Sequence, residues 1–209
     1  MVIFNRRQLR PGLIFSVKGT NLLSILISTV LSRGFNKLLP EVTKIVPVCP
    51  CHDGIVVEVD EQFYIGESRP FKARLTSLDT YEEKFESNIC LNPRIFEVKI
   101  ATKIEEYTAA EYWLKHVNGT LYDFMAFPYL SIKNLLMDNS EKVAGWEWAH
   151  WCTEGVAEAY CAALGYDIYN KTNPTPLTTI KRVLEGVFRD VSDQMFIDMP
   201  PLKRAKRTP

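Results

Sequence analysis

The sequence has little of what marks the non-globular classes of protein. Among 209 residues there are only 10 glycines, 12 prolines and 5 cysteines. This is too little Gly and Pro for a collagen-like or low-complexity chain, and too little Cys for a disulfide scaffold. The cysteine count is odd, so at least one thiol has no partner within the chain, and a reducing compartment is the simpler expectation. With 46% hydrophobic residues, the composition predicts a soluble globular protein with one sizeable core.

Long hydrophobic runs are also missing. The apolar run Leu22–Leu31 has about half the length that a helix needs to cross a bilayer. It follows Pro11-Gly12, and no cleavage site of small residues comes after it. The sequence therefore predicts neither a signal peptide nor a transmembrane helix, and a cytoplasmic location is expected.

Net charge is absent as well, because 25 basic residues balance 25 acidic ones. Four of the basic residues lie in the last seven positions, which leaves 21 basic against 25 acidic residues in 1–202, a net charge of −4. A mildly acidic body lacks the positive face that nucleic acid requires, so no nucleic-acid partner is expected. We predict one domain over residues 1–199 and a basic, disordered tail over 200–209, although such a tail also fits a nuclear-import or nucleic-acid patch.

Strand-forming runs gather in the first half of the chain. Runs rich in β-branched and aromatic residues predict strands at Leu13–Val17, Gly54–Val59, Gln62–Glu67 and Arg94–Ile100. The two middle runs flank Asp60-Glu61, which predicts a β-hairpin with a two-residue turn.

Helical patterns dominate the second half. Helices are predicted at about 20–32, 108–117, 122–137, 152–164 and 177–187, with helix-like spacing also in 71–87. Loops are expected at 138–142 and around 173–176. Strands followed by helices indicate an α+β fold, a small antiparallel sheet packed against helices.

Cys152 is the best-placed cysteine for chemistry because it opens the predicted helix 152–164. The free N–H groups and the positive dipole end at a helix N-terminus lower a thiol pKa and can hold an oxyanion. A small buried cysteine in the first turn of a core helix is an equally good interpretation. Cys161, inside the same helix, is assigned to packing.

The register of the predicted hairpin selects a base and its partner. If Asp60-Glu61 is the turn, Gly54 lies opposite Glu67. His52, two residues before Gly54, then shares a face with Glu67 as its diagonal neighbour. A carboxylate there can hold the imidazole tautomer, as in a Cys-His-acid site. The alternative is a surface His beside a surface Glu.

Two other assignments remain open for these residue types. His150 is close to Cys152 in sequence and could be the base instead, although neighbours at a helix entry usually point apart. Cys49-Pro50-Cys51-His52 offers three zinc ligands, but the chain has no second pair with ligand spacing. We therefore expect no metal and no cofactor.

Five short motifs together resemble a known family. In chain order they are Arg10-Pro11-Gly12-Leu13-Ile14, Cys51-His52-Asp53-Gly54-Ile55-Val56, Tyr64-Ile65-Gly66-Glu67-Ser68, Gly119–Phe127 with Tyr122-Asp123, and Trp151-Cys152-Thr153-Glu154. Their order resembles the circularly permuted, papain-like NlpC-type cysteine hydrolases, in particular the YiiX-like branch, from about residue 9 to 188. The chain departs from the pattern at Leu13, Thr153 and Gly155, where the family has an acidic residue, Ser and an apolar residue.

The resemblance implies a papain-like fold and a thiol hydrolase. Cys152 would be the nucleophile, His52 the general base and Glu67 the orienting group. The implied substrate is a peptide or cell-wall peptide amide. Acyl transfer or lipid amide or ester hydrolysis on the same residues is the alternative, as is a non-catalytic binding module. Tyr64, Tyr122, Trp148 and Trp151 are candidates for the substrate pocket or for the core, and nothing in the sequence indicates an oligomeric state.

Overall fold

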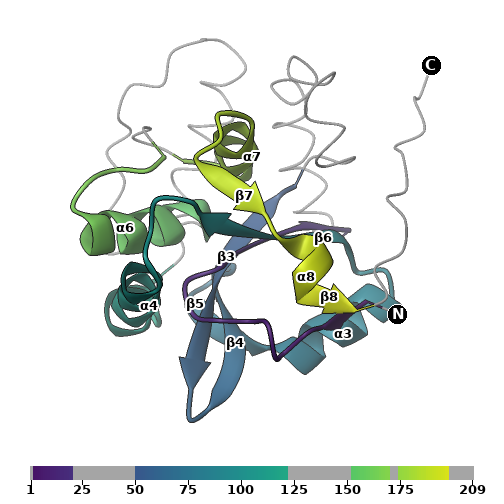
Figure 1. The fold of residues 1–209 in the computed structure, drawn as a ribbon. Helices are drawn as coiled ribbons and strands as arrows, with labels where there is room; N and C mark the ends of the chain where they lie inside the picture. The colour runs from purple at the N-terminus through teal and green to yellow at the C-terminus, as the bar shows by residue number, and fades with distance from the viewer. Residues whose placement is uncertain (1, 21–49, 122–151, 170–173, 198–209) are drawn as a thin grey trace, which may run out of the picture.

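A six-stranded antiparallel sheet forms the centre of the molecule (Figure 1). The computed structural model describes residues 2–20, 50–121, 152–169 and 174–197, and all structural statements concern these residues. The strand order is β5-β4-β3-β2-β6-β7. The strands are β2 (Ile14–Gly19), β3 (His52–Val59), β4 (Gln62–Ser68), β5 (Ala73–Ser77), β6 (Cys90–Val98) and β7 (Phe188–Asp190). A second, two-stranded sheet pairs β1 (Ile3–Phe4) with β8 (Phe196–Ile197).

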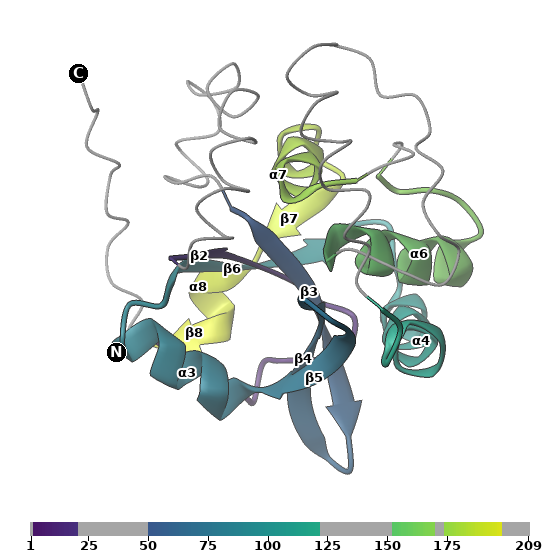
Figure 2. The same ribbon diagram turned by 180° about the vertical axis from the view of Figure 1, so that it is seen from behind.

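Helices cover both faces of the large sheet, as Figures 1 and 2 show from opposite sides. One face carries α4 (Lys103–Tyr112), the π-helical turn η1 (Trp113–Val117), α6 (Cys152–Leu164) and α7 (Pro176–Leu184). The other face carries α3 (Leu78–Glu86), α8 (Ser192–Met195) and β1. The predicted α+β fold, with an antiparallel sheet packed against helices, is confirmed.

Alternate residues of the central strands enter two separate cores. Ile55 and Val57 of β3 pack with α4 and α6, whereas Val56 between them packs with α3. Ile14 and Phe15 of β2 divide in the same way. This follows from the period-two geometry of a strand. Both faces of the middle of β3 are therefore buried, which explains the apolar run Ile55-Val56-Val57.

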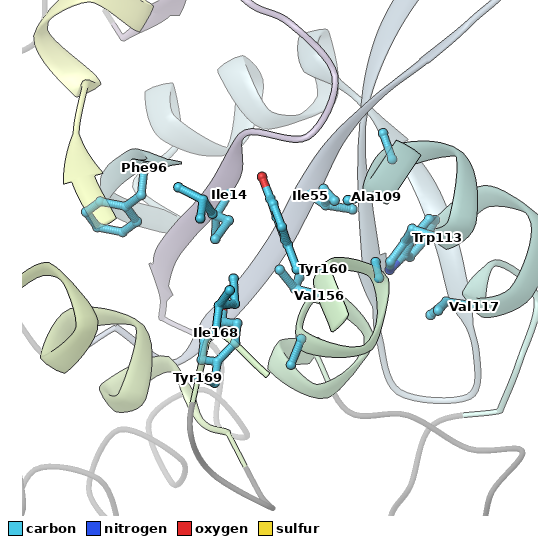
Figure 3. Packing of buried hydrophobic residues seen from close by; sticks show 14 of the residues in the cluster. Ile14, Ile55, Phe96, Ala109, Trp113, Val117, Val156, Tyr160, Ile168 and Tyr169 are labelled. Carbon is cyan, nitrogen blue, oxygen red and sulfur yellow. The ribbon is translucent and has the colours of Figure 1, made fainter. Parts of the chain in front are cut away.

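Tyr160 anchors α6 to the centre of the sheet. Its ring lies among Ile14, Ile55 and Val156 (Figure 3). Its buried hydroxyl donates a hydrogen bond to the backbone carbonyl of Gly12 at 2.5 Å. The helix that begins with Cys152 is thereby fixed near the start of β2.

Trp113 fixes the same helix from the other side. A Cβ atom placed on Gly66 of β4 would lie 2.7 Å from the Trp113 ring, so the indole rests directly on the strand backbone. A Cβ on Gly155 of α6 would lie 2.8 Å from Cγ1 of Val117 and 3.3 Å from Nε1 of Trp113. Gly155, a departure from the family pattern, is thus required here by close packing.

The predicted hairpin register is confirmed. Val59 pairs with Gln62 and Ile55 with Gly66, as a two-residue turn requires. Asp60 and Glu61 adopt φ values of 50° and 62°. Positive φ at both central positions is the type I′ geometry that suits the twist of a hairpin, and it forms here without glycine.

Residues 71–87 differ from the helical prediction. Leu75 belongs to β5 and pairs with Gly66 of β4. The helix α3 begins only at Leu78, where the Ser77 hydroxyl accepts a hydrogen bond from the N–H of Thr80. The i, i+3 spacing of Leu75 and Leu78 is typical of a helix, but Leu75 instead forms strand pairing with β4.

Other boundaries also differ from the prediction. Helix α4 begins at Lys103, five residues early, because Thr102 and Glu105 form a capping box. The last long helix ends at Leu184, before Val187. The strand predicted at 94–100 begins at Cys90 and ends at Val98. The sequence patterns missed the short elements β1, β7, α8 and β8.

Several predictions fall on residues that the structure does not describe. These are most of the helix at 20–32, the helix at 122–137, the loop at 138–142, part of the loop at 173–176, and the tail. The domain assignment 1–199 stays a prediction for the same reason. Within the described residues, no helix is both long enough and apolar enough to span a membrane.

Candidate active site

His52 and Glu67 form a buried pair on adjacent strands. His52 is the first residue of β3, and Glu67 is the penultimate residue of β4. Nε2 of His52 contacts Oε2 of Glu67, whose side chain is fully buried. The structure thus brings together the two residues that the hairpin register selected. An N–H on Nε2 that points at the carboxylate leaves the lone pair of Nδ1 available to accept a proton.

Three further side chains hold the Glu67 carboxylate. Thr76 donates a hydrogen bond to Oε1 at 2.5 Å, and the Tyr81 hydroxyl donates to Oε2. Nε of Arg69 lies 2.8 Å from Oε2 as an ion pair, and Nη2 of Arg69 also donates to the Tyr81 hydroxyl at 2.9 Å. Burial alone would raise the pKa of Glu67, but His52 and Arg69 outweigh it and hold that pKa well below its usual range.

The same surroundings keep His52 neutral. Burial lowers the pKa of His52 below its usual 6.5, and the nearby Arg69 guanidinium lowers it further, whereas Glu67 opposes both. The net direction is downward. At neutral pH the imidazole is therefore uncharged and able to act as a base.

Cys152 is the first residue of α6 and is buried. Burial raises the pKa of its thiol to about 12, and the neighbouring Asp53 carboxylate adds to this shift. A backbone hydrogen bond from Asp53 and the Thr153 side chain act in the opposite direction. The helix N-terminus had predicted a lowered pKa, but desolvation beside a carboxylate is the larger effect.

Asp53 is a site residue that the sequence analysis missed. It follows His52 in β3, so its side chain points to the opposite face, where Ser16, Thr153 and Thr179 all donate hydrogen bonds to it. Burial raises the pKa of Asp53, and these three hydroxyls oppose the shift. The sequence feature that could have revealed Asp53 is a single carboxylate on the apolar face of a buried strand.

The structure brings two of the three predicted catalytic residues into contact. His52 and Glu67 are in direct contact, whereas Thr153, the residue after Cys152, donates a hydrogen bond to Asp53, the residue next to His52. Within the described residues, no hydrogen bond joins the His52 ring to the Cys152 thiol. The His52 and Asp53 side chains point to opposite faces of β3, so the imidazole and the first turn of α6 lie on different sides of this strand.

Only one of the predicted pocket residues is described. Tyr64 lies opposite Val57 in the hairpin, on the face opposite to Glu67, and packs half-buried against the helix-covered core. Its hydroxyl donates to Oε1 of Gln62 at 3.1 Å. This placement favours its packing role. Tyr122, Trp148 and Trp151 lie outside the described residues, as does the alternative base His150.

The described residues contain no group of three or more His, Cys, Asp or Glu side chains that could hold a metal ion. Cys51 is buried, and its sulfur accepts a hydrogen bond from the N–H of Gly19 at 3.1 Å. Cys49, the other thiol of the zinc hypothesis, lies outside the described part of the chain.

Comparison with known proteins finds likenesses among solved structures but none among sequences. No family model matches the chain, and no curated protein sequence matches it. A crystal structure of the metalloprotein YiiX from Escherichia coli O157:H7 is similar, with a TM-score of 0.49 and 16% identity, covering 93% of this chain and 91% of that chain. At this level, the likeness says nothing about activity or bound metal.

Proposed function

We propose that this protein is a cysteine-dependent hydrolase that cleaves an amide bond, in a peptide or cell-wall peptide, through an acyl-enzyme on Cys152. The contact between Nε2 of His52 and the buried Glu67 carboxylate carries the proposal. It fixes the imidazole at the start of β3, next to Asp53, which accepts a hydrogen bond from Thr153, the neighbour of Cys152. Our assignment makes Cys152 the nucleophile, His52 the base and then acid, and Glu67 the residue that orients His52.

The reaction would begin from a protonated thiol, because the pKa of Cys152 is raised to about 12. Nδ1 of His52 takes the thiol proton as the sulfur bonds to the substrate carbonyl carbon. Backbone N–H groups at the start of α6 stabilise the oxyanion. The C–N bond then breaks, and the amine leaves with the proton from His52. Water, deprotonated by His52, attacks the thioester and releases the acid and the thiol.

A second candidate function is a non-catalytic binding module with the same fold. The raised thiol pKa and the missing His52–Cys152 hydrogen bond favour it. A module of this kind would keep Cys152 as a packing residue. Its thiol would then show no enhanced reactivity.

A thiol-directed activity probe separates the two candidates. The parent protein should be labelled at Cys152, and Cys152→Ala should abolish that labelling while the circular dichroism spectrum stays unchanged. His52→Ala should lower labelling strongly, whereas Cys161→Ser, which removes an exposed thiol, should not affect labelling at Cys152. Undiminished labelling of Cys152→Ala would refute the hydrolase proposal, and no labelling of the parent protein would favour the binding module.

If labelling succeeds, the acyl group identifies the substrate class. Incubation with peptide donors and with lipid amide or ester donors, followed by mass spectrometry of the Cys152 peptide, distinguishes peptide hydrolysis from lipid chemistry. A mass increase with peptide donors alone supports the peptide substrate that we propose. An increase with lipid donors alone transfers the assignment to the lipid alternative.

A further inference from the structure

Asp53 joins three separate elements to β3. Its Oδ1 accepts a hydrogen bond from Ser16 of β2 at 2.6 Å. Its Oδ2 accepts one from Thr153 of α6 at 2.9 Å and one from Thr179 of α7 at 2.6 Å. The carboxylate and all three hydroxyl-bearing residues are buried. Breaking any of these hydrogen bonds would leave part of a buried carboxylate unpaired, which is costly, so the arrangement is rigid.

The carboxylate of Asp53 reaches the first turn of α6. It accepts a hydrogen bond from Thr153, the residue after Cys152, and its charge raises the pKa of the Cys152 thiol. The sulfur of Cys152 also lies 3.9 Å from Oγ1 of Thr153. Tyr160 and Trp113 hold the body of α6 on the sheet, whereas Asp53 holds its first turn, which carries the thiol, against β3.

We propose that Asp53 is a positioning residue for Cys152, which it holds against the start of β3 through the hydroxyl of Thr153. Its catalytic meaning rests on the proposed hydrolase function, but its effect on the thiol does not. A charged residue serves here because a carboxylate oxygen accepts two hydroxyl donors at once and so ties α6 and α7 to the same point. Thr153, the departure from the family Ser, keeps the hydroxyl that this role requires.

Alkylation of Cys152 by iodoacetamide tests the proposal without any substrate. The rate is followed from pH 6 to 10 by mass spectrometry in a Cys161→Ser background, which removes an exposed competing thiol. Asp53→Asn removes the charge and keeps an acceptor. Its pH profile should shift down by about one unit, which is roughly tenfold faster alkylation at pH 8, because the negative charge opposes the thiolate.

Variants at the two threonines separate positioning from general loosening. Thr153→Val should raise the alkylation rate at least about fivefold at pH 8 by releasing the first turn of α6, and Thr153→Ser should restore the parent rate within about twofold. Thr179→Val removes a donor from the same oxygen but from α7, and should stay within about twofold of the parent.

The outcomes are decisive in each case. An unshifted profile for folded Asp53→Asn, or equal effects of Thr153→Val and Thr179→Val, would overturn the proposal. If Asp53→Asn does not fold, the Thr153→Val and Thr153→Ser pair decides alone. Since alkylation needs no turnover, failure of the hydrolase proposal appears only in the activity-probe experiment, and failure of the positioning proposal appears only here.

Discussion

Replacement of Glu67 by Gln should weaken both the fold and the base. The substitution keeps the shape of the side chain but removes the negative charge that faces Arg69 and His52. The amide oxygen can take over the contacts of Oε2, and the amide group can then donate to the Thr76 hydroxyl, which rotates. The main loss is therefore the countercharge of Arg69, most of whose side chain is buried.

Breaking a buried ion pair by removing one partner typically costs about 3–5 kcal/mol. Because Gln preserves part of the hydrogen bonding, we expect the lower end, about 3 kcal/mol, or a fall of roughly 6–12 °C in Tm for a chain of this size. Urea unfolding followed by tryptophan fluorescence is a suitable assay, since the Trp113 ring rests on Gly66, next to Glu67. The matched control is Glu58→Gln on exposed β3 surface, which should change stability by less than about 0.5 kcal/mol.

The pH dependence gives a second readout of the same pair. The pKa of Glu67 is lowered in the folded state, so its stabilisation is complete above the unfolded value of 4.5 and is lost as the pH falls below it. His52 also has a lowered pKa, so stability begins to fall below about pH 6.5. Each group contributes up to about 1.4 kcal/mol per pH unit.

In the Glu67→Gln variant, the loss of stability below pH 4.5 that comes from Glu67 is absent. Measured in a His52→Ala background, which removes the titration of His52 from both proteins, the difference in unfolding free energy between Glu67 and Gln at this position should therefore shrink steadily between pH 4.5 and 3.5. A difference that stays constant from pH 7 to 3.5, or a variant as stable as the parent at pH 7, would refute the buried ion pair as the source of stability.

Two further predictions concern backbone positions. Gly66→Ala should destabilise the protein by about 1–3 kcal/mol in urea unfolding, because the added Cβ would lie 2.7 Å from the Trp113 ring; a neutral result would show that the indole can move away. Glu61→Gly should stabilise it by roughly 0.5 kcal/mol in thermal unfolding, because relief of a positive φ at a non-glycine residue exceeds the added chain entropy; a lower Tm would contradict this balance.

The His52–Glu67 pair could be predicted from sequence because it depends on local geometry. Once Asp60 and Glu61 form the turn, the antiparallel ladder fixes which residues of β3 and β4 share a face. The α6 boundaries follow from similarly local signals, an apolar run and then Gly165 with a φ of 76°.

The Asp53 cluster could not be predicted, because its four members come from distant parts of the chain. Ser16, Thr153 and Thr179 carry no shared spacing with Asp53, and only tertiary packing unites them. The direction in which the pKa of Cys152 shifts could not be predicted for the same reason. The helix terminus is visible in the sequence, but the burial and the adjacent carboxylate that decide the pKa are not.

Because the His52 and Asp53 side chains point in opposite directions, the surroundings of the base and those of the thiol can change independently. The base receives its support from Tyr81 of α3, through Glu67, on one side of β3, and the thiol receives its support from Asp53, through Thr153 of α6, on the other. These helices belong to different cores. The two halves of the site are therefore separate modules that share only one strand, and changes in α3 can tune the base without disturbing the surroundings of the thiol.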